Sequence, residues 1–385
     1  MTPSHPEDGP SPAAIPSPIL YLARGGALDG QQQQVLQLAS ALPGLGGSAF
    51  VALDEPGALL DALRERDVAA GHFPQRSWRS PARYLPAWID AFRLLALARQ
   101  KGVQLIHAHD HWRSPYARFL SRRLSIPYVV HIRGPIGVEH VRKYRLAEAD
   151  AVIVIARRYA ATLRAAGVAD RKIFVVSDGV DLARFHPADN DAERHRPDRE
   201  TVVGMVGRID SFKRVTDFVD IVAALPEEQR TAARFLLVGE EPDRGYAAAV
   251  RARIGRHGLA ECIAFTGRVP ADRMPALLGG LDVLVTLSGG SVMFEAMAMG
   301  TVVLSVRDDG QHSQYTIDGD TAVCVDGASV ETAADALASL IARPDRRNAL
   351  ARAGRALIER ELSAERIAAE TDAVYRSLPA AGRRR

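Results

Sequence analysis

Short apolar runs alternate with amphipathic helical segments through both halves of the chain, and this alternation constrains the fold most. In the first half, strand-like runs occupy residues 19–23, 47–53, 103–109, 127–132, 151–156 and 172–177. In the second half they occupy residues 201–207, 233–239, 262–267, 281–287, 301–306 and 322–325. Helical patterns lie between several of these runs. Such a βαβ rhythm predicts an α/β fold with two Rossmann-like, doubly wound parallel sheets.

A chain of 385 residues is long for one domain and suits two. The composition predicts a proline-rich disordered leader at 1–17, a first domain at 18–186, a charged linker at 187–200, a second domain at 201–362 and a final helix at 363–379. No apolar run reaches the roughly 18 residues of a membrane span. The first residues also lack the basic and apolar regions of a signal peptide. We therefore expect a cytoplasmic protein.

Basic residues concentrate in one stretch of the first half. Between positions 113 and 145, eight cations stand against a single acid, Glu139. They are Arg113, Arg118, Arg122, Arg123, Arg133, Arg142, Lys143 and Arg145. Such a patch could meet anionic lipid on the inner face of a membrane or an anionic acceptor, and a solvated helix face is an equally open interpretation. Nucleic acid is disfavoured as a partner, because no known binding module accompanies the charge.

Two loops of the first half are candidates for ligand contact. Residues 24–30 (RGGALDG) place glycines between a strand and a helix, with Gly30 nearest the helix start. Backbone amides there could approach an anion or a sugar closely, although a plain tight turn explains the same residues. His131 and Arg133 follow another strand. The carboxyl ends of parallel strands line the ligand crevice of doubly wound sheets, so both side chains are placed to touch a bound group.

Alternating histidines end a further strand. His107, His109 and His111 could suggest a metal-binding face. No carboxylate or cysteine has the usual ligand spacing relative to them. Polar packing at the strand end is therefore the favoured interpretation, and no metal site is predicted.

Two cations follow the first strand of the second half. Arg208 and Lys213 belong to the sequence VGRIDSFK at 206–213. Cleavage of a sugar–phosphate bond develops negative charge on the leaving diphosphate, and two fixed cations stabilise that charge in the transition state. Arginine offers a planar fork and lysine a mobile point charge. A solvated pair on a loop is the alternative interpretation.

A glycine turn opens an apolar helix about eighty residues later. Gly290, Ser291 and Val292 stand at the predicted helix start, where bare amides receive an oxyanion. Glu295 lies one turn inside, with apolar neighbours on both sides. A lone acid in such a segment is costly to bury unless it binds hydrogen-bond donors, and the two hydroxyls of a ribose would satisfy it.

These segments together resemble glycosyltransferase family 4, the retaining enzymes of the GT-B fold. The resemblance extends from about Ile19 to Leu378. It rests on the sequences SDGVDLARF (177–185), VGRIDSFK (206–213), LLVGEE (236–241), FTGRV (265–269) and EAMAMGTVVL (295–304). The family's fold implies two Rossmann-like domains facing an interdomain cleft, with a last helix that crosses back to the N-terminal domain.

The resemblance assigns a role to each candidate residue. Arg208 and Lys213 would bind the diphosphate, and Glu295 would hold the nucleotide ribose as the second acid of an E-x7-E motif. The remaining matches are Gly290, Ser291 and Val292 around the phosphate, His131 near the donor sugar, Arg268 against the base and Gly30 in the N-terminal glycine loop. The sequence departs from the pattern at Leu287, where the family has its first acid, and in GQHSQYTIDG (310–319), where Ser313 or Gln314 stands near a usual glutamate.

We therefore expect a retaining glycosyltransferase that moves a sugar from a UDP- or GDP-sugar to a hydroxyl of a glycan, lipid-linked or small-molecule acceptor. A role in polysaccharide biosynthesis at the membrane surface fits this activity. No metal or other cofactor is expected, because cations and helix amides supply the charge. The alternative is a non-catalytic GT-B protein that binds nucleotide-sugar as a regulator or partner, which Leu287 favours. A dehydrogenase is disfavoured because the dinucleotide glycine pattern is absent.

Overall fold

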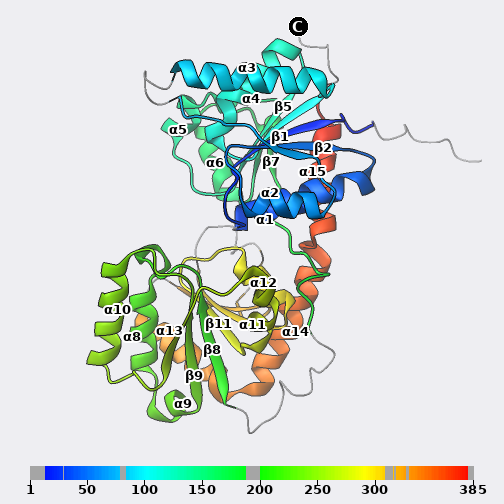
Figure 1. Cartoon of the computed structure of the whole chain (residues 1–385). Helices are drawn as coiled ribbons and strands as arrows, with labels where there is room; N and C mark the ends of the chain where they lie inside the picture. Colours follow the sequence, from blue (N-terminus) through cyan, green and yellow to red (C-terminus); the bar gives the residue numbers. More distant parts are fainter. Residues whose placement is uncertain are drawn as a thin grey trace, which may run out of the picture. The chain divides into compact units, whose positions relative to one another are not determined.

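The computed structural model of the chain describes residues 14–28, 30–78, 84–187, 200–307, 315, 318–326 and 329–379. Most of the expected leader and linker, and most of the segment 310–319, lie outside these residues. The chain divides into two compact units. Unit 1 comprises Met1–Ser177 with Glu365–Arg385, and unit 2 comprises Asp178–Ala364. Each unit is an α/β domain built on one parallel sheet (Figure 1).

Unit 1 has a seven-stranded parallel sheet in the order β3-β2-β1-β4-β5-β6-β7. Its strands are β1 (Ile19–Ala23), β2 (Ala49–Leu53), β3 (Ala70–His72), β4 (Leu105–Ala108), β5 (Tyr128–Ile132), β6 (Ala151–Val154) and β7 (Ile173–Val175). The apolar runs predicted all of these except β3. That strand has the sequence Ala-Gly-His, which is too short and too polar to stand out as an apolar run.

The helices of unit 1 are α1 (Gly30–Ala41), α2 (Ala58–Glu65), α3 (Tyr84–Gln100), α4 (Ser114–Leu124), α5 (Val138–Lys143), α6 (Arg157–Ala165) and α15 (Ala364–Arg376). Successive strand residues point to opposite faces of the sheet. On one face, Leu20 and Leu22 of β1 share a buried apolar cluster with α3 and α4. On the other face, Tyr21 meets α15, where its hydroxyl lies 3.1 Å from the Tyr375 hydroxyl.

Unit 2 has a six-stranded parallel sheet in the order β10-β9-β8-β11-β12-β13. Its strands are β8 (Thr201–Val206), β9 (Ala233–Val238), β10 (Ile263–Gly267), β11 (Val283–Thr286), β12 (Val302–Arg307) and β13 (Val323–Asp326). Its helices are α8 (Val215–Ala224), α9 (Glu227–Thr231), α10 (Arg244–Arg256), α11 (Met274–Gly280), α12 (Val292–Ala298), α13 (Val330–Ala342) and α14 (Pro344–Glu361). The predicted fold class of two parallel-sheet α/β domains is confirmed.

The strand order reverses once in each sheet, and these two reversals decide where ligands bind. In unit 1 the chain starts at the central strand β1, moves outward through β2 and β3, and returns to β4 on the other side of β1. In unit 2 the same reversal lies between β8 and β11. Loops leave the sheet in opposite directions at such a point, so the carboxyl ends of the two central strands form a crevice.

Candidate functional site

The reversal in unit 2 brings together residues that are about eighty positions apart in the sequence. Arg208 and Lys213 follow β8, whereas Gly289 and Gly290 follow β11. The Lys213 ammonium donates a hydrogen bond of 3.0 Å to the carbonyl oxygen of Gly289. Burial lowers the pKa of Lys213; Asp210 raises it in opposition and Arg208 lowers it further. A partly buried cation is therefore held against the loop that opens α12.

Asp210 organises this cation pair, and it was not predicted as a site residue from the sequence. Its side chain caps the short 3-10 helix Ser211–Lys213 by accepting a 3.0 Å hydrogen bond from the backbone amide of Lys213. The other carboxylate oxygen lies 3.1 Å from the Arg208 guanidinium. The signal was present in VGRIDSFK, because an aspartate three residues before a helical position is a typical N-cap.

At two positions of the motif sequences, Gly207 and Gly239, neighbouring atoms lie too close to leave room for a Cβ atom. A Cβ at Gly207 would lie 3.0 Å from Cε of Lys213, so the lysine side chain passes directly over this residue. A Cβ at Gly239, at the end of β9, would lie 1.8 Å from the carbonyl oxygen of Gly207. Both residues have a positive φ, at 143° and 152°. The glycines in VGR and LLVG therefore allow the backbone conformation and the close packing that the chain needs beneath the Lys213 side chain.

The loop that contains Gly289 and Gly290 leads directly into the N-terminus of α12. Ser291 precedes the helix and Val292 is its first residue, and the Ser291 side chain makes no capping hydrogen bond. Gly290 has a φ of 126°, and a Cβ at that position would lie 3.4 Å from the Lys213 ammonium. The predicted residues Arg208, Lys213 and Gly290 are thus gathered at one place, where backbone amides and cations suit a diphosphate.

Glu295 is partly buried on α12, within the apolar segment that the sequence indicated. Burial raises the pKa of its carboxyl from 4.5 to about 7, and Arg184 opposes this rise electrostatically. Arg184 comes from the segment SDGVDLARF, whose contribution to unit 2 was not predicted. A carboxyl whose pKa is raised by burial lacks hydrogen-bond donors for its charged form, and the two hydroxyls of a ligand would supply them.

Leu287 does not stand at the site. Its side chain is 6% exposed and belongs to the buried apolar cluster of unit 2, where Ile221 of α8 and Ala333 of α13 line the same small space. The motif spacing counted back from Glu295 placed an acid at this position, but the side chain points into the core. An acid at position 287 would be buried among apolar groups. Leu287 therefore packs in the core of unit 2, and its interpretation as the replacement of a ligand-contacting acid stays a prediction.

Arg268 lies at the same edge of the sheet but away from the cation pair. It follows β10, which is separated from β8 by β9 in the strand order. Its side chain is exposed. Its expected place against a nucleotide base stays a prediction.

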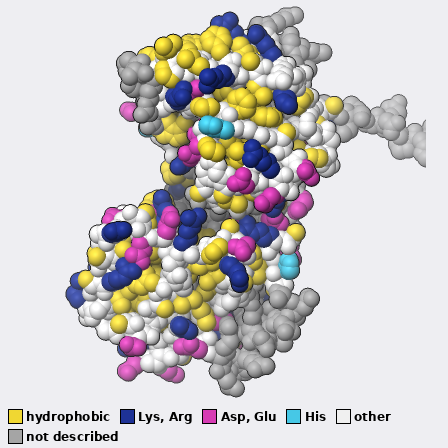
Figure 2. Space-filling model, viewed as in Figure 1, with side chains coloured by type: hydrophobic (Ala, Val, Ile, Leu, Met, Phe, Trp, Pro, Cys, Tyr) yellow, Lys and Arg dark blue, Asp and Glu magenta, His cyan; other side chains and the backbone are white. Residues whose placement is uncertain are grey.

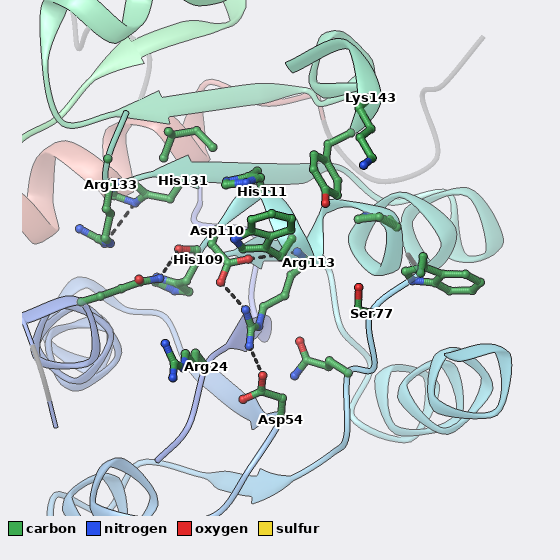
Figure 3. A pocket seen from close by; sticks show the side chains of 18 of the residues that line it. Arg24, Asp54, Ser77, His109, Asp110, His111, Arg113, His131, Arg133 and Lys143 are labelled. Atoms are coloured by element: carbon green, nitrogen blue, oxygen red, sulfur yellow. Dashed lines mark hydrogen bonds and ion pairs between the residues drawn. The ribbon is translucent and has the colours of Figure 1, made fainter. Parts of the chain in front are cut away.

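Unit 1 contains a cavity of about 670 Å³ at the carboxyl ends of its strands (Figure 3). The loops after β1, β2, β3, β4 and β5 supply its walls, and those after β1 and β4 place it at the reversal of strand order. His131 lines this cavity, as predicted for a strand-end residue. Gly30 is the first residue of α1, and its neighbour Gln31 lines the cavity and donates a 2.9 Å hydrogen bond to the His109 carbonyl.

His107, His109 and His131 form a buried stack, each with 0% exposure. The rings of His107 and His109 are 4.1 Å apart at 18°, and those of His107 and His131 are 5.5 Å apart at 6°. Burial lowers the pKa of all three imidazoles well below the usual value, so they are neutral. Nitrogen lone pairs lie in the ring plane, and nearly parallel planes cannot converge on one ion. The nitrogen atoms approach within 4.8 Å, but this stacking does not fit a metal centre.

The hydrogen bond of His131 determines which of its nitrogens carries the proton. The Arg133 guanidinium lies 3.2 Å from Nδ1 of His131. A guanidinium only donates, so Nδ1 accepts and the proton resides on Nε2. That Nε2 group is buried and has no partner within the described part of the chain. His131 therefore offers a neutral hydrogen-bond donor at the cavity wall.

Other buried polar groups around the cavity are similarly unsatisfied. Among the described residues, Nε1 of Trp78, the Tyr144 hydroxyl and both ring nitrogens of His109 have no protein partner. All three side chains line the cavity. Buried polar groups are ordinarily hydrogen-bonded, so this wall suits a ligand rich in hydroxyl or anionic oxygen atoms.

The charges that line the cavity are four cations, Arg24, Arg113, Arg133 and Lys143, and two carboxylates, Asp54 and Asp110. Arg113 binds both carboxylates and is buried (Figure 3). Burial raises the pKa of Asp110, and Arg113 opposes this rise. The cavity thus has an excess of positive charge after the internal pairs are counted.

Several cations of the basic run from 113 to 145 form ion pairs with acids, which the count along the sequence did not indicate. Arg118, Arg122 and Arg145 all pair with Glu148, which lies just outside the counted window. Arg113 is likewise neutralised by acids outside the window. A local count of charge misses such partners because the fold brings them from other elements.

Comparisons with known proteins identify the family. Residues 188–357 match the family model Glycosyl transferases group 1, and residues 28–184 match the model Glycosyltransferase Family 4. A 2-deoxystreptamine glucosyltransferase of Streptomyces kanamyceticus is 32% identical over 251 residues, and the chain spans only 63% of that relative's length and aligns over 56% of its own. A D-inositol 3-phosphate glycosyltransferase of Nocardia farcinica is 28% identical over 309 residues, covering 73% of this chain and 68% of that protein.

The fold also matches a solved structure. The Anabaena protein Alr3699/HepE, in complex with UDP and glucose, superimposes with a TM-score of 0.80 at 20% identity, covering 94% of this chain and 100% of that one. Because the two family models together match most of the chain, the chain belongs to the group 1 glycosyltransferases of family 4.

Proposed function

We propose that this protein is a retaining glycosyltransferase whose unit 2 binds a nucleotide-diphosphate sugar, with a UDP-sugar as the first candidate. The observation that carries the proposal is the cluster of Lys213, Arg208 and the N-terminus of α12 at the reversal of strand order. Fixed cations and bare helix amides are the groups that a diphosphate requires. The Anabaena neighbour, solved with UDP and glucose, supports the choice of uridine.

The proposed reaction needs no protein nucleophile. The bond between the anomeric carbon of the donor and the diphosphate oxygen breaks, and the acceptor hydroxyl oxygen bonds to that carbon on the same face. The hydroxyl proton passes to the departing diphosphate. Lys213 and Arg208 stabilise the charge that develops on this leaving group, and Glu295 holds the ribose hydroxyls. Because these groups supply the positive charge, we expect no metal requirement.

The acceptor is proposed to bind in the cavity of unit 1. Its unsatisfied donors on Trp78, Tyr144 and His131, together with the excess of cations, suit a polyhydroxylated acceptor with an anionic group. The name of the Nocardia relative, a D-inositol 3-phosphate glycosyltransferase, describes an acceptor of this chemistry. A glycan or lipid-linked phosphate presented at the inner face of a membrane has the same chemistry, and this would make the protein a peripheral membrane enzyme of polysaccharide biosynthesis.

The second candidate function is nucleotide-sugar binding without catalysis. Its support was Leu287, and the core position of that side chain weakens it. The transferase therefore remains the better proposal.

The test is nucleoside diphosphate release from UDP-, GDP- and ADP-sugars in EDTA, with myo-inositol phosphate and cell-extract glycolipid as acceptors. The wild type is compared with Arg208→Ala/Lys213→Ala. Arg273→Ala is the matched control, because that arginine is 79% exposed at the end of the 3-10 helix Ala271–Arg273 in unit 2. Release from one donor that the double variant loses and the control retains supports the transferase. Tight donor binding without release from any acceptor favours the binding-only function, and a strict need for added metal contradicts the proposed charge stabilisation.

A further inference from the structure

Helix α3 is apolar on both of its sides. Its inner side, with Ala91 and Leu94, is buried in the core of unit 1. Its outer side exposes Leu85, Trp88, Ile89 and Phe92 to solvent, at 72%, 43%, 44% and 51% of their surface. The spacing of these four residues puts them on a single face of the helix. Five of the eight exposed large hydrophobic side chains among the described residues belong to α3, so the exposure is concentrated there.

Aromatic side chains of neighbouring segments extend this outer face. The Phe119 ring of α4 lies 5.3 Å from Trp88 and 5.5 Å from Phe92. Trp78, in the loop before α3, lies 5.2 Å from Trp88. Figure 2 shows hydrophobic side chains gathered along the edge of unit 1 where α3 and α4 lie in Figure 1, with lysines and arginines beside them. We call this surface, formed by Leu85, Trp88, Ile89, Phe92 and Phe119, the α3 face.

The exposed charges that α3 and α4 themselves contribute are all positive, although Arg122 also pairs with Glu148 of a neighbouring segment. Exposed Arg93 and Arg99 belong to α3, and exposed Arg122 and Arg123 to α4. The only carboxylate in either helix is Asp90, which is 1% exposed and bonded to Arg76. The guanidinium of Arg123 lies 5.5 Å from the centre of the Phe119 ring, so cationic and apolar surface are contiguous.

This charge pattern favours one binding partner of the α3 face over another. A two-fold contact between copies of the chain would set the α3 face against itself, and it would bring arginines together with no exposed acid of either helix to pair with them. An anionic bilayer offers hydrocarbon for the aromatic and aliphatic side chains and negative head groups for the arginines. None of the described helices is long and apolar enough to cross a membrane, so α3 would lie along the surface.

We propose that the α3 face docks this protein on the surface of an anionic bilayer. The helix lies in the interfacial plane, with Leu85, Trp88 and Phe92 inserted among the acyl chains and Arg93 and Arg123 near the lipid phosphates. The docking surface shares Phe119 and Arg123 with the run at 113–145, whereas Arg118 and Arg145 of that run pair with Glu148.

The α3 face adjoins the cavity of unit 1. Trp78 touches Trp88 of that face and also lines the cavity. An acceptor anchored in the bilayer would therefore reach the cavity beside the docked helix. This consequence rests on the proposed transferase function, whereas membrane docking itself does not.

The experiment is flotation of the full chain with vesicles of neutral phosphatidylcholine, or with 30% phosphatidylglycerol added, at low and at 0.5 M NaCl. The wild type is expected to float with anionic vesicles, and high salt should lower its partition coefficient at least several-fold. Leu85→Ser/Phe92→Ser removes two exposed apolar side chains and should lower the partition coefficient about 10-fold or more. Arg93→Glu/Arg123→Glu should abolish flotation at low salt.

Phe212→Ser is the matched control, because Phe212 is 64% exposed in unit 2 and its loss should not change flotation. Failure of the wild type to float, or an equal loss in Phe212→Ser and Leu85→Ser/Phe92→Ser, overturns the proposal. A wild-type dimer in light scattering that Leu85→Ser/Phe92→Ser dissociates also overturns it, since the face would then join copies of the chain. Donor cleavage assayed without lipid reports the transferase separately, so failure of docking and failure of the function are distinguishable.

Discussion

The carboxyl of Glu295 should make unit 2 less stable as the pH rises, and the substitution Glu295→Gln should remove this effect. Burial raises the pKa of this group from 4.5 to about 7 in the folded protein. Between these two values the folded state binds a proton that the unfolded state has released. The free energy of unfolding therefore falls as the pH rises from about 4.5 to about 7 and is level above that.

The size of the effect follows from the shift. A difference of 2.5 units between 4.5 and about 7 corresponds, at roughly 1.4 kcal/mol per unit, to about 3 kcal/mol. This is an upper value, because the side chain is only partly buried and retains some contact with solvent. Glutamine has the same shape and no charge, so Glu295→Gln should match the wild type near pH 4.5 and exceed it by up to about 3 kcal/mol at pH 8.

The assay is urea unfolding at several pH values between 4.5 and 8.5, followed by far-ultraviolet circular dichroism and by tryptophan fluorescence. All three tryptophans, Trp78, Trp88 and Trp112, belong to unit 1. Fluorescence therefore reports unit 1 as an internal reference, and the dichroism transition contains the response of unit 2. Glu228→Gln, at an exposed glutamate of α9, is the control and should show no pH-dependent gain.

A gain that is the same at pH 5 and pH 8 would refute the reasoning, because a charge-dependent cost must vanish when the carboxyl is protonated. A gain that grows toward low pH would have the wrong sign. Saturating nucleoside diphosphate should lower the pKa of Glu295 if ribose hydroxyls donate to it, and this would shift the pH dependence to lower values.

Three further outcomes follow from the geometry. Lys213→Met should weaken nucleoside diphosphate binding roughly 10- to 100-fold in calorimetry, because a charged hydrogen-bond donor is lost; Lys172→Met, which removes a comparable 2.9 Å lysine–carbonyl bond in unit 1, should leave it unchanged. Gly239→Ala should lower the free energy of unfolding by about 3 kcal/mol or more, since its Cβ would meet a backbone oxygen at 1.8 Å, whereas Gly255→Ala, with open space around it in α10, should be neutral or stabilising; equal effects would contradict this. Tyr375→Phe removes the hydroxyl that lies 2.6 Å from the buried His107 and should destabilise unit 1 by about 1–3 kcal/mol in the fluorescence transition.

The motif residues of unit 2 show how far sequence reasoning reaches. Arg208, Lys213 and Gly290 were predicted from local patterns, since a strand end, a glycine turn and a helix start are each encoded within a few residues. Asp210 was missed although its capping position is equally local. Arg184 was missed for a different reason, because its electrostatic contact with Glu295 joins segments more than a hundred residues apart.

Leu287 and the basic run at 113–145 show where motif spacing and local charge counts fail to predict the surroundings of a side chain. Motif spacing assigned position 287 to a ligand contact, but the direction of the side chain depends on where β11 ends and on the helices that cover that face of the sheet. Charge counting described a patch, but Glu148 and Asp54 come from outside the window and pair with its arginines.

The sequence by itself determined the fold class, the two-unit organisation and most of the strands, because the periods of apolar residues are local and every buried parallel strand must be apolar. It also contained the chemistry of the cation pair and the lone acid. Only the tertiary structure decided that three buried histidines stack against a cavity, that Leu287 faces the core and that α3 leaves an apolar face uncovered. These features depend on which elements become neighbours, and pairing between distant segments is set by the packing of whole sheets and helices rather than by any short stretch of chain.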